Sequence, residues 1–121
     1  KTKEYFMLEN VGHDGYQAGL DYLLGGNDNT SGIAIWHIDD NQSNNGADVN
    51  HKLVDLEEAA EAGMDNSSHS GKQTNLFFSG NKTEFSDSTD PNSKTYSGTS
   101  SGITINNISA SGDSMTFDIT F

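Results

Sequence analysis

The chain contains no cysteine, so neither a disulfide framework nor a thiolate zinc site can hold the fold together. Basic residues are also scarce. Lysine and arginine number 6 against 18 aspartate and glutamate residues, which gives a formal net charge of -12. Such a charge repels phosphate backbones and anionic lipid headgroups. We therefore expect no nucleic-acid partner.

Long apolar runs are absent as well. None approaches the ~18–20 residues that a membrane-spanning helix needs, and no basic segment followed by an apolar one opens the chain. We therefore expect no membrane insertion, and any secretion signal would lie upstream. Hydrophobic residues make up 31% of the sequence, below the ~45–50% usual for globular domains. Much of the chain should be loop, and a length of 121 residues without a linker predicts one domain, 1–121.

The apolar pattern that remains is that of β-strands. Glu4–Val11 is rich in aromatic and large apolar residues and predicts a largely buried strand. Gly32–Asp39 is the clearest strand, because apolar residues occupy both of its faces, as expected for a central strand. One face would carry Ile33, Ile35 and His37, and the other Ala34, Trp36 and Ile38, with Trp36 in the core.

The rest of the chain predicts short strands separated by polar loops. Tyr16–Leu24 is too short to assign, and Leu53–Ala62 is interpreted as a strand that runs into a turn. The polar stretch Gly63–Ser100 and the terminal hairpin complete the pattern. We therefore predict a mainly β, sandwich-like antiparallel domain with long polar loops. Its loop anchors would be Leu76, Phe77, Phe78, Phe85 and Tyr96, and its hairpin strands would carry Ile103, Ile105 and Ile108, then Met115, Phe117, Ile119 and Phe121.

No catalytic zinc motif is present. A zinc peptidase needs two histidines one helical turn apart with a glutamate between them, as in H-E-x-x-H. The four histidines, at positions 13, 37, 51 and 69, are isolated from one another. We expect His37 to be an inward-facing histidine that is hydrogen-bonded in the core. A metal-dependent hydrolase would instead need His37, Asp39 and Glu57 to converge.

Calcium is the cation that the composition favours, because it takes six to eight hard oxygen ligands from irregular loops. Bound calcium would also relieve the repulsion among so many carboxylates. One candidate cluster is Asn27–Asn29, and none of the clusters fits the twelve-residue EF-hand loop. The metal ligands we predict are Asp39, Asp40, Asp55, Glu57 and Glu58.

Several of these segments, in this order, resemble a known family. The strand pair 4–10 and 32–39, followed by His51 and the Asp55–Ala59 stretch, resembles the region after the catalytic motif in immune-inhibitor-A-like metallopeptidases. The later segments 91–98, 101–103 and 107–118 resemble the C-terminal portion of that family. The chain has Ala60 and Asn75 where acidic residues are expected from the resemblance.

The resemblance implies a secreted bacterial zinc endopeptidase as the parent protein, with calcium as a structural ion. The zinc would lie in the parent's catalytic domain and not in this chain. We therefore expect an extracellular, non-catalytic accessory domain that packs on the catalytic domain. The alternative is an independent extracellular module that binds carbohydrate or a surface protein, which would need exposed aromatic residues such as Tyr16, Tyr22, Trp36 and Tyr96.

Overall fold

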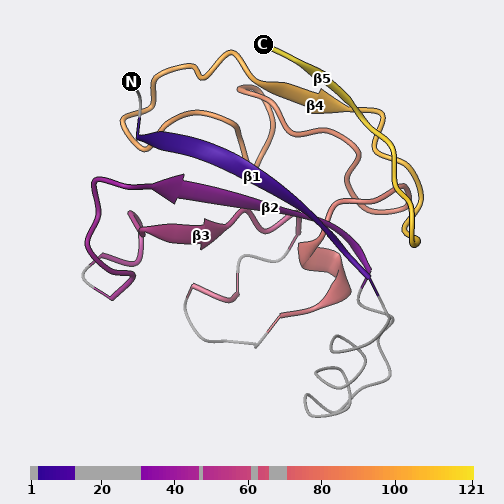
Figure 1. The fold of residues 1–121 in the computed structure, drawn as a ribbon, viewed down its shortest axis with the longest axis horizontal. Helices are drawn as coiled ribbons and strands as arrows, with labels where there is room; N and C mark the ends of the chain where they lie inside the picture. Colours follow the sequence, from indigo (N-terminus) through magenta and orange to yellow (C-terminus); the bar gives the residue numbers. More distant parts are fainter. Residues whose placement is uncertain (1–2, 13–30, 47, 61–62, 66–70) are drawn as a thin grey trace.

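A computed structural model describes residues 3–12, 31–46, 48–60, 63–65 and 71–121. These residues form two antiparallel sheets (Figure 1). The larger sheet has the order β1-β2-β3, and the smaller one pairs β4 with β5. The predicted mainly β, sandwich-like fold is confirmed. The strands are β1 (Glu4–Val11), β2 (Gly32–Asp39), β3 (Val54–Leu56), β4 (Thr104–Asn106) and β5 (Asp118–Thr120).

Strand β2 lies at the centre of the larger sheet, as its apolar pattern predicted. It pairs with β1 along its whole length, from Gly32 opposite Val11 to Asp39 opposite Glu4. On its other side it pairs with β3 through residues 36–38. Farther along the same edge, Ile33 and Phe77 exchange two backbone hydrogen bonds of 2.9 Å. The segment around Phe77 therefore extends this edge of the sheet beyond β3.

A second bridge joins the long polar stretch to the smaller sheet. Phe85 and Ile105 of β4 exchange two backbone hydrogen bonds of 2.8 Å. The chain between Phe77 and Phe85 therefore crosses from one sheet to the other. A short 3₁₀ turn, η1 (Gln73–Asn75), precedes this crossing.

The core lies between the inner face of the larger sheet and this crossing segment. The rings of Phe6 and Phe77 both meet the ring of Phe85 edge-on, at centroid distances of 5.2 and 5.8 Å. The predicted anchors Leu76, Phe77 and Phe85 are buried. The core cluster consists of Ile33, Ile35, Ala59, Phe77, Phe85, Ile105 and Ile108.

Gly32 is needed where the crossing segment reaches the sheet. A Cβ atom at this position would lie 2.9 Å from the Cβ of Leu76 and 3.1 Å from the carbonyl oxygen of Phe77. Such a contact is too short for a real side chain, so the backbones could not approach this closely. The glycine allows the bridge between Ile33 and Phe77 to form.

Two burial predictions were wrong. Strand β1 alternates half-buried and exposed residues and is not largely buried, because it is an edge strand with one open face. Trp36 is only half-buried and is not a core residue. Its indole Nε1 donates a 3.0 Å hydrogen bond to Oε2 of Glu9 on the same outer side of the sheet. Alternation alone cannot show how much of this face is covered.

The predicted terminal hairpin is confirmed, with Ile105 opposite Ile119. Its two strands are short, and of the predicted apolar stripe only Met115 packs against the core. Phe117, Ile119 and Phe121 are exposed. Within the described residues no helix is long and apolar enough to cross a membrane.

Candidate functional site

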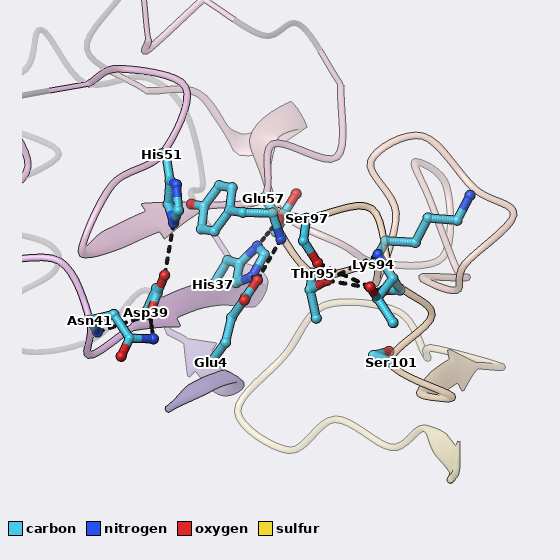
Figure 2. Close-up of polar contacts among 12 residues, drawn as sticks. Glu4, His37, Asp39, Asn41, His51, Glu57, Lys94, Thr95, Ser97 and Ser101 are labelled. Carbon is cyan, nitrogen blue, oxygen red and sulfur yellow. Dashed lines mark hydrogen bonds and ion pairs between the residues drawn. The ribbon is translucent and has the colours of Figure 1, made fainter. Parts of the chain in front are cut away.

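The inner face of the larger sheet is apolar at one end and polar at the other, where His37 lies. His37 is 2% exposed, and both of its ring nitrogens contact carboxylates. Nδ1 lies 2.9 Å from Oε1 of Glu57, and Nε2 lies 2.8 Å from Oε1 of Glu4 (Figure 2). The prediction of an inward-facing, hydrogen-bonded histidine is confirmed.

This geometry suits a protonated His37. An imidazolium has two N–H groups, one for each carboxylate, whereas a neutral imidazole has only one. Burial alone would lower the pKa of His37, but the hydrogen bonds and negative charges of Glu57 and Glu4 outweigh it and raise the pKa above its usual value. The raised pKa favours the imidazolium form of His37 between the two carboxylates.

Tyr96 covers this group from the loop that precedes β4. Its ring stacks on His37 at a centroid distance of 4.2 Å and an interplanar angle of 9°, and it lies 4.2 Å from the His51 ring on its other side. Its backbone N–H donates a 2.6 Å hydrogen bond to Oε1 of Glu4. Burial and the charges of Asp55 and Glu57 raise the pKa of the Tyr96 hydroxyl, so it stays neutral.

His51 completes the stack and binds a second buried carboxylate. Its Nε2 lies 2.7 Å from Oδ2 of Asp39, which is 3% exposed (Figure 2). The backbone N–H and the side-chain amide of Asn41 both donate to Oδ1 of the same carboxylate. Burial would raise the pKa of Asp39, but these hydrogen bonds and His51 hold it below its usual value.

We refer to these six residues as the histidine cluster: Glu4, His37, Asp39, His51, Glu57 and Tyr96. The convergence that a hydrolase would need is incomplete, because His37 contacts Glu57 while Asp39 contacts His51. Both nitrogens of His37 are already occupied by carboxylates, so it has no free nitrogen to accept a proton or bind a metal. The cluster ties the Tyr96 loop to the sheet.

The five predicted metal ligands do not all lie together. Asp39 belongs to the histidine cluster, and Asp40 is exposed next to it. Three of the five, Asp55, Glu57 and Glu58, line one pocket of about 200 Å³ together with Asp65 and Asp90. Asp55 is bound by the ammonium group of Lys52 at 2.6 Å, which also contacts Asp65.

As the side chains stand, no group of three histidines or carboxylates in the described part of the chain could hold a metal ion. Calcium binding by Asp39, Asp40, Asp55, Glu57 and Glu58 stays a prediction. The Asn27–Asn29 cluster lies outside the described residues.

Glu58 is a buried carboxylate that accepts hydrogen bonds from neutral N–H groups. The backbone N–H groups of Gly63 and Met64 donate to it at 3.2 Å, and the side-chain amide of Asn75 donates at 2.9 Å. The same amide donates at 2.8 Å to the carbonyl of Ala60. The Asn75 side chain and the Ala60 backbone therefore meet beside Glu58.

Two members of the histidine cluster were not predicted. Glu4 could have been found, because strand alternation places it on the same face as Phe6 and Leu8, where a carboxylate needs a partner. Tyr96 was expected only as a loop anchor. No spacing in the sequence indicates that its ring lies between two histidines.

The opposite face of the larger sheet carries exposed apolar side chains. Cross-strand pairing aligns Tyr5 with Ile38 and Val54 in one row, and Met7 with Trp36 and Leu56 in the next. Met7 is 52% exposed, Tyr5 39% and Val54 37%. Contiguous apolar side chains at this exposure mark an interaction surface more often than isolated ones do. These six residues are called the outer face.

Comparison with known proteins identified no relative: no family model, no curated protein and no solved structure matches this chain.

Proposed function

We propose that this chain is an accessory, non-catalytic domain of a secreted zinc metallopeptidase and that it packs on the catalytic domain through its outer face. The observation that carries the proposal is the pair of apolar rows across β1, β2 and β3. An antiparallel sheet with one covered face normally presents polar residues on the other. Six apolar residues in two adjacent rows are better explained by a partner that covers them.

The histidine cluster supports a non-catalytic role. Hydrolysis by a zinc enzyme needs a histidine nitrogen on the metal and a free carboxylate as base. In this cluster the carboxylates of Glu4 and Glu57 bind His37, and the carboxylate of Asp39 binds His51. The residues that could perform chemistry are used to hold the fold.

Calcium and zinc enter the proposal from the sequence rather than from the geometry. Zinc belongs to the proposed parent's catalytic domain, and secretion follows from the same resemblance. Calcium is favoured by the net charge of -12, although the described carboxylates do not form a site for it.

The test uses the gene that encodes the chain. Its full coding sequence should contain an H-E-x-x-H motif outside residues 1–121. The catalytic part and this chain, expressed separately, should associate in calorimetry, and the chain alone should not cleave casein with added zinc. Association that is absent, or cleavage by the pure chain, would contradict the proposal.

A matched pair of variants identifies the surface. Met7 and Val49 are both 52% exposed, but Met7 lies on the outer face and Val49 in a loop. Met7→Lys should weaken association about tenfold or more, which corresponds to about 1.4 kcal/mol at an interface. Val49→Lys introduces the same charge and should leave the dissociation constant unchanged. Equal effects of the two variants would place the contact elsewhere.

One observation favours a second function. Trp36 lines a hollow together with the amide of Asn45 and the carboxylates of Asp55 and Asp65. An aromatic ring beside amide and carboxylate groups is a combination that can bind a sugar. An extracellular carbohydrate-binding module is therefore the alternative. Oligosaccharides that shift the emission of Trp36, the only tryptophan, would support it.

A further inference from the structure

A hollow lies beside Trp36. It has a volume of about 230 Å³ and opens at the β3 edge of the larger sheet. Pockets for free small molecules usually have volumes of about 300–1,000 Å³. This hollow is smaller and is better matched to one large side chain than to a free ligand. Its lining combines apolar residues, Trp36, Val54, Leu56 and Met64, with polar ones, Asn45, Lys52, Asp55 and Asp65.

The polar groups around the hollow are already engaged with one another. The amide of Asn45 donates to the carbonyl of Val54 and accepts from its N–H, both at 2.9 Å. Lys52 binds both Asp55 and Asp65. A partner therefore gains little by hydrogen bonding to these groups. The surface that remains available is the apolar one around Trp36.

Trp36 is held in place before any partner arrives. Its indole Nε1 donates to Glu9 at 3.0 Å, and its neighbours across the sheet are Met7 and Leu56. A fixed aromatic ring costs little side-chain entropy on binding, and such residues supply much of the energy of protein interfaces. The hollow therefore has the properties of an interface anchor site.

The charges around the hollow select the partner. Its lining holds two carboxylates, Asp55 and Asp65, and one ammonium group, that of Lys52. A third carboxylate, that of Glu9, accepts the hydrogen bond from Trp36. The chain as a whole carries a formal charge of -12. A partner surface with Lys or Arg opposite these carboxylates would be attracted, whereas an acidic one would be repelled.

We infer that this hollow receives one large apolar side chain of a protein partner, and that a basic residue of the partner lies next to that side chain. The inference rests on the proposed function, since the partner is the domain that covers the outer face. It adds the position of the anchor and the chemistry of the contacting segment.

The experiment uses two small probes on the chain itself. The indole N–H signal of the only tryptophan reports on the hollow in NMR spectra. N-acetyl-Leu-Arg-amide should shift this signal with millimolar affinity, and N-acetyl-Leu-Glu-amide should bind roughly fivefold more weakly because of the surrounding carboxylates. A shift by neither probe, or equal affinity for both, would overturn the inference. So would a shift by chito- or cello-oligosaccharides alone.

Variants separate the hollow from the rest of the outer face. Met64→Ala removes one apolar wall and should weaken binding of the Leu-Arg probe, whereas Met7→Ala lies outside the hollow and should not. Asp65→Asn should reduce the difference between the two probes. An unchanged affinity in Met64→Ala would contradict the inference. The association test with Met7→Lys does not involve the hollow, so failure of the proposed function and failure of the anchor site give different results.

Discussion

The adjacent carboxylates Glu57 and Glu58 are stabilised in two different ways. Glu57 lies 2.9 Å from a ring nitrogen of His37, so its partner is a titratable group. Glu58 accepts hydrogen bonds from neutral N–H groups, including the side-chain amide of Asn75. The first interaction depends on the protonation of a histidine, whereas the second depends on one amide being present. The two carboxylates can therefore be tested separately, Glu58 by substitution of Asn75 and Glu57 by the pH dependence of stability.

The amide of Asn75 should be indispensable at its position. Asn75 is 1% exposed, and its Oδ1 also accepts a 2.7 Å hydrogen bond from the backbone N–H of Lys72. Asn75→Asp would replace a donor to Glu58 with a second buried negative charge. We expect a loss of about 3–5 kcal/mol in the free energy of unfolding, as for other uncompensated buried charges. Urea denaturation measures it.

Added calcium tests whether charge repulsion causes the loss of stability in Asn75→Asp. If repulsion between two carboxylates is responsible, millimolar calcium should recover part of the stability of Asn75→Asp, because a cation can bind between them. Asn75→Ala removes the same donor without adding a charge and should show no such recovery. If calcium restored the stability of both variants equally, this account would be contradicted. It would also be contradicted if Asn75→Asp had the same urea midpoint as the parent chain.

The pH dependence of stability should follow His37 and Asp39. The pKa of His37 is raised in the folded chain, so its contribution is complete below the unfolded value of about 6.5 and is lost as pH rises through the folded value. The pKa of Asp39 is lowered. Its contribution is present above the unfolded value of about 3.9 and is lost as pH falls through the folded value.

Stability should therefore be highest between about pH 4 and about pH 6.5. The urea midpoint should fall as pH rises from about 6 to about 9, and His37→Gln, although less stable at every pH, should not show this decline. A midpoint of the parent chain that stays constant or increases over this range would show that His37 is not held as an imidazolium.

At the level of elements, Tyr96 should control the loop that carries it. That loop is closed locally by two backbone hydrogen bonds between residues 95 and 98–99, of 2.8 and 3.0 Å. Its contacts with the sheet run through the Tyr96 ring and backbone. Tyr96→Ala should cost about 2–3 kcal/mol, somewhat less than removal of a fully buried aromatic residue.

Hydrogen exchange shows which part of the chain Tyr96→Ala destabilises. In Tyr96→Ala the amide protons of residues 93–101 should exchange faster than in the parent chain. The amide protons of β2 should remain ranked among themselves as in the parent chain, from slowest to fastest exchange. Tyr96→Phe retains the stacked ring and is the control, with a change within about 0.5 kcal/mol. Faster exchange across the whole sheet, without a local effect, would show that the loop is not held through this residue.

The strands themselves could be read from the sequence, because they depend on local alternation. The bounds of β1 and β2 agree with the predicted ranges 4–11 and 32–39. Burial could not be read in the same way, since Trp36 and Met7 are apolar residues on a face that no described segment covers fully. Alternation says which residues share a face but not which face is covered.

The candidate site was predictable in part for the same reason. His37 faces inward by alternation and had to find partners there. Its contact with Tyr96 joins residues 59 positions apart in the sequence, and the approach of Asn75 to Glu58 depends on how a loop returns to the sheet. Such contacts are set by tertiary packing, which single-sequence patterns do not encode.

At the scale of the whole molecule, the net charge of -12 should make stability depend on cations. A calcium ion bound only by the native state adds about 2.7 kcal/mol at a hundredfold excess over its dissociation constant, which raises the melting temperature by roughly 5–10 °C. Magnesium should stabilise less, because it releases its waters reluctantly.

Matched ionic strength is the control for calcium. Diffuse screening predicts that sodium chloride at the same ionic strength stabilises equally. A melting temperature that is the same in calcium, in chelator and in matched sodium chloride would contradict the calcium prediction. Asp39, Asp40, Asp55, Glu57 and Glu58 would then serve only their protein partners and the solvent.

The central claim is that a partner domain covers the outer face, and oxidation of Met7 tests it most directly. Met7 is 52% exposed in this chain, so dilute peroxide should convert it readily to the sulfoxide. In the full protein encoded by the gene, we predict that its oxidation, measured by mass spectrometry of peptides, slows by about tenfold or more while that of a free methionine standard does not change. Equal oxidation rates of Met7 in the chain and in the full protein would contradict the claim.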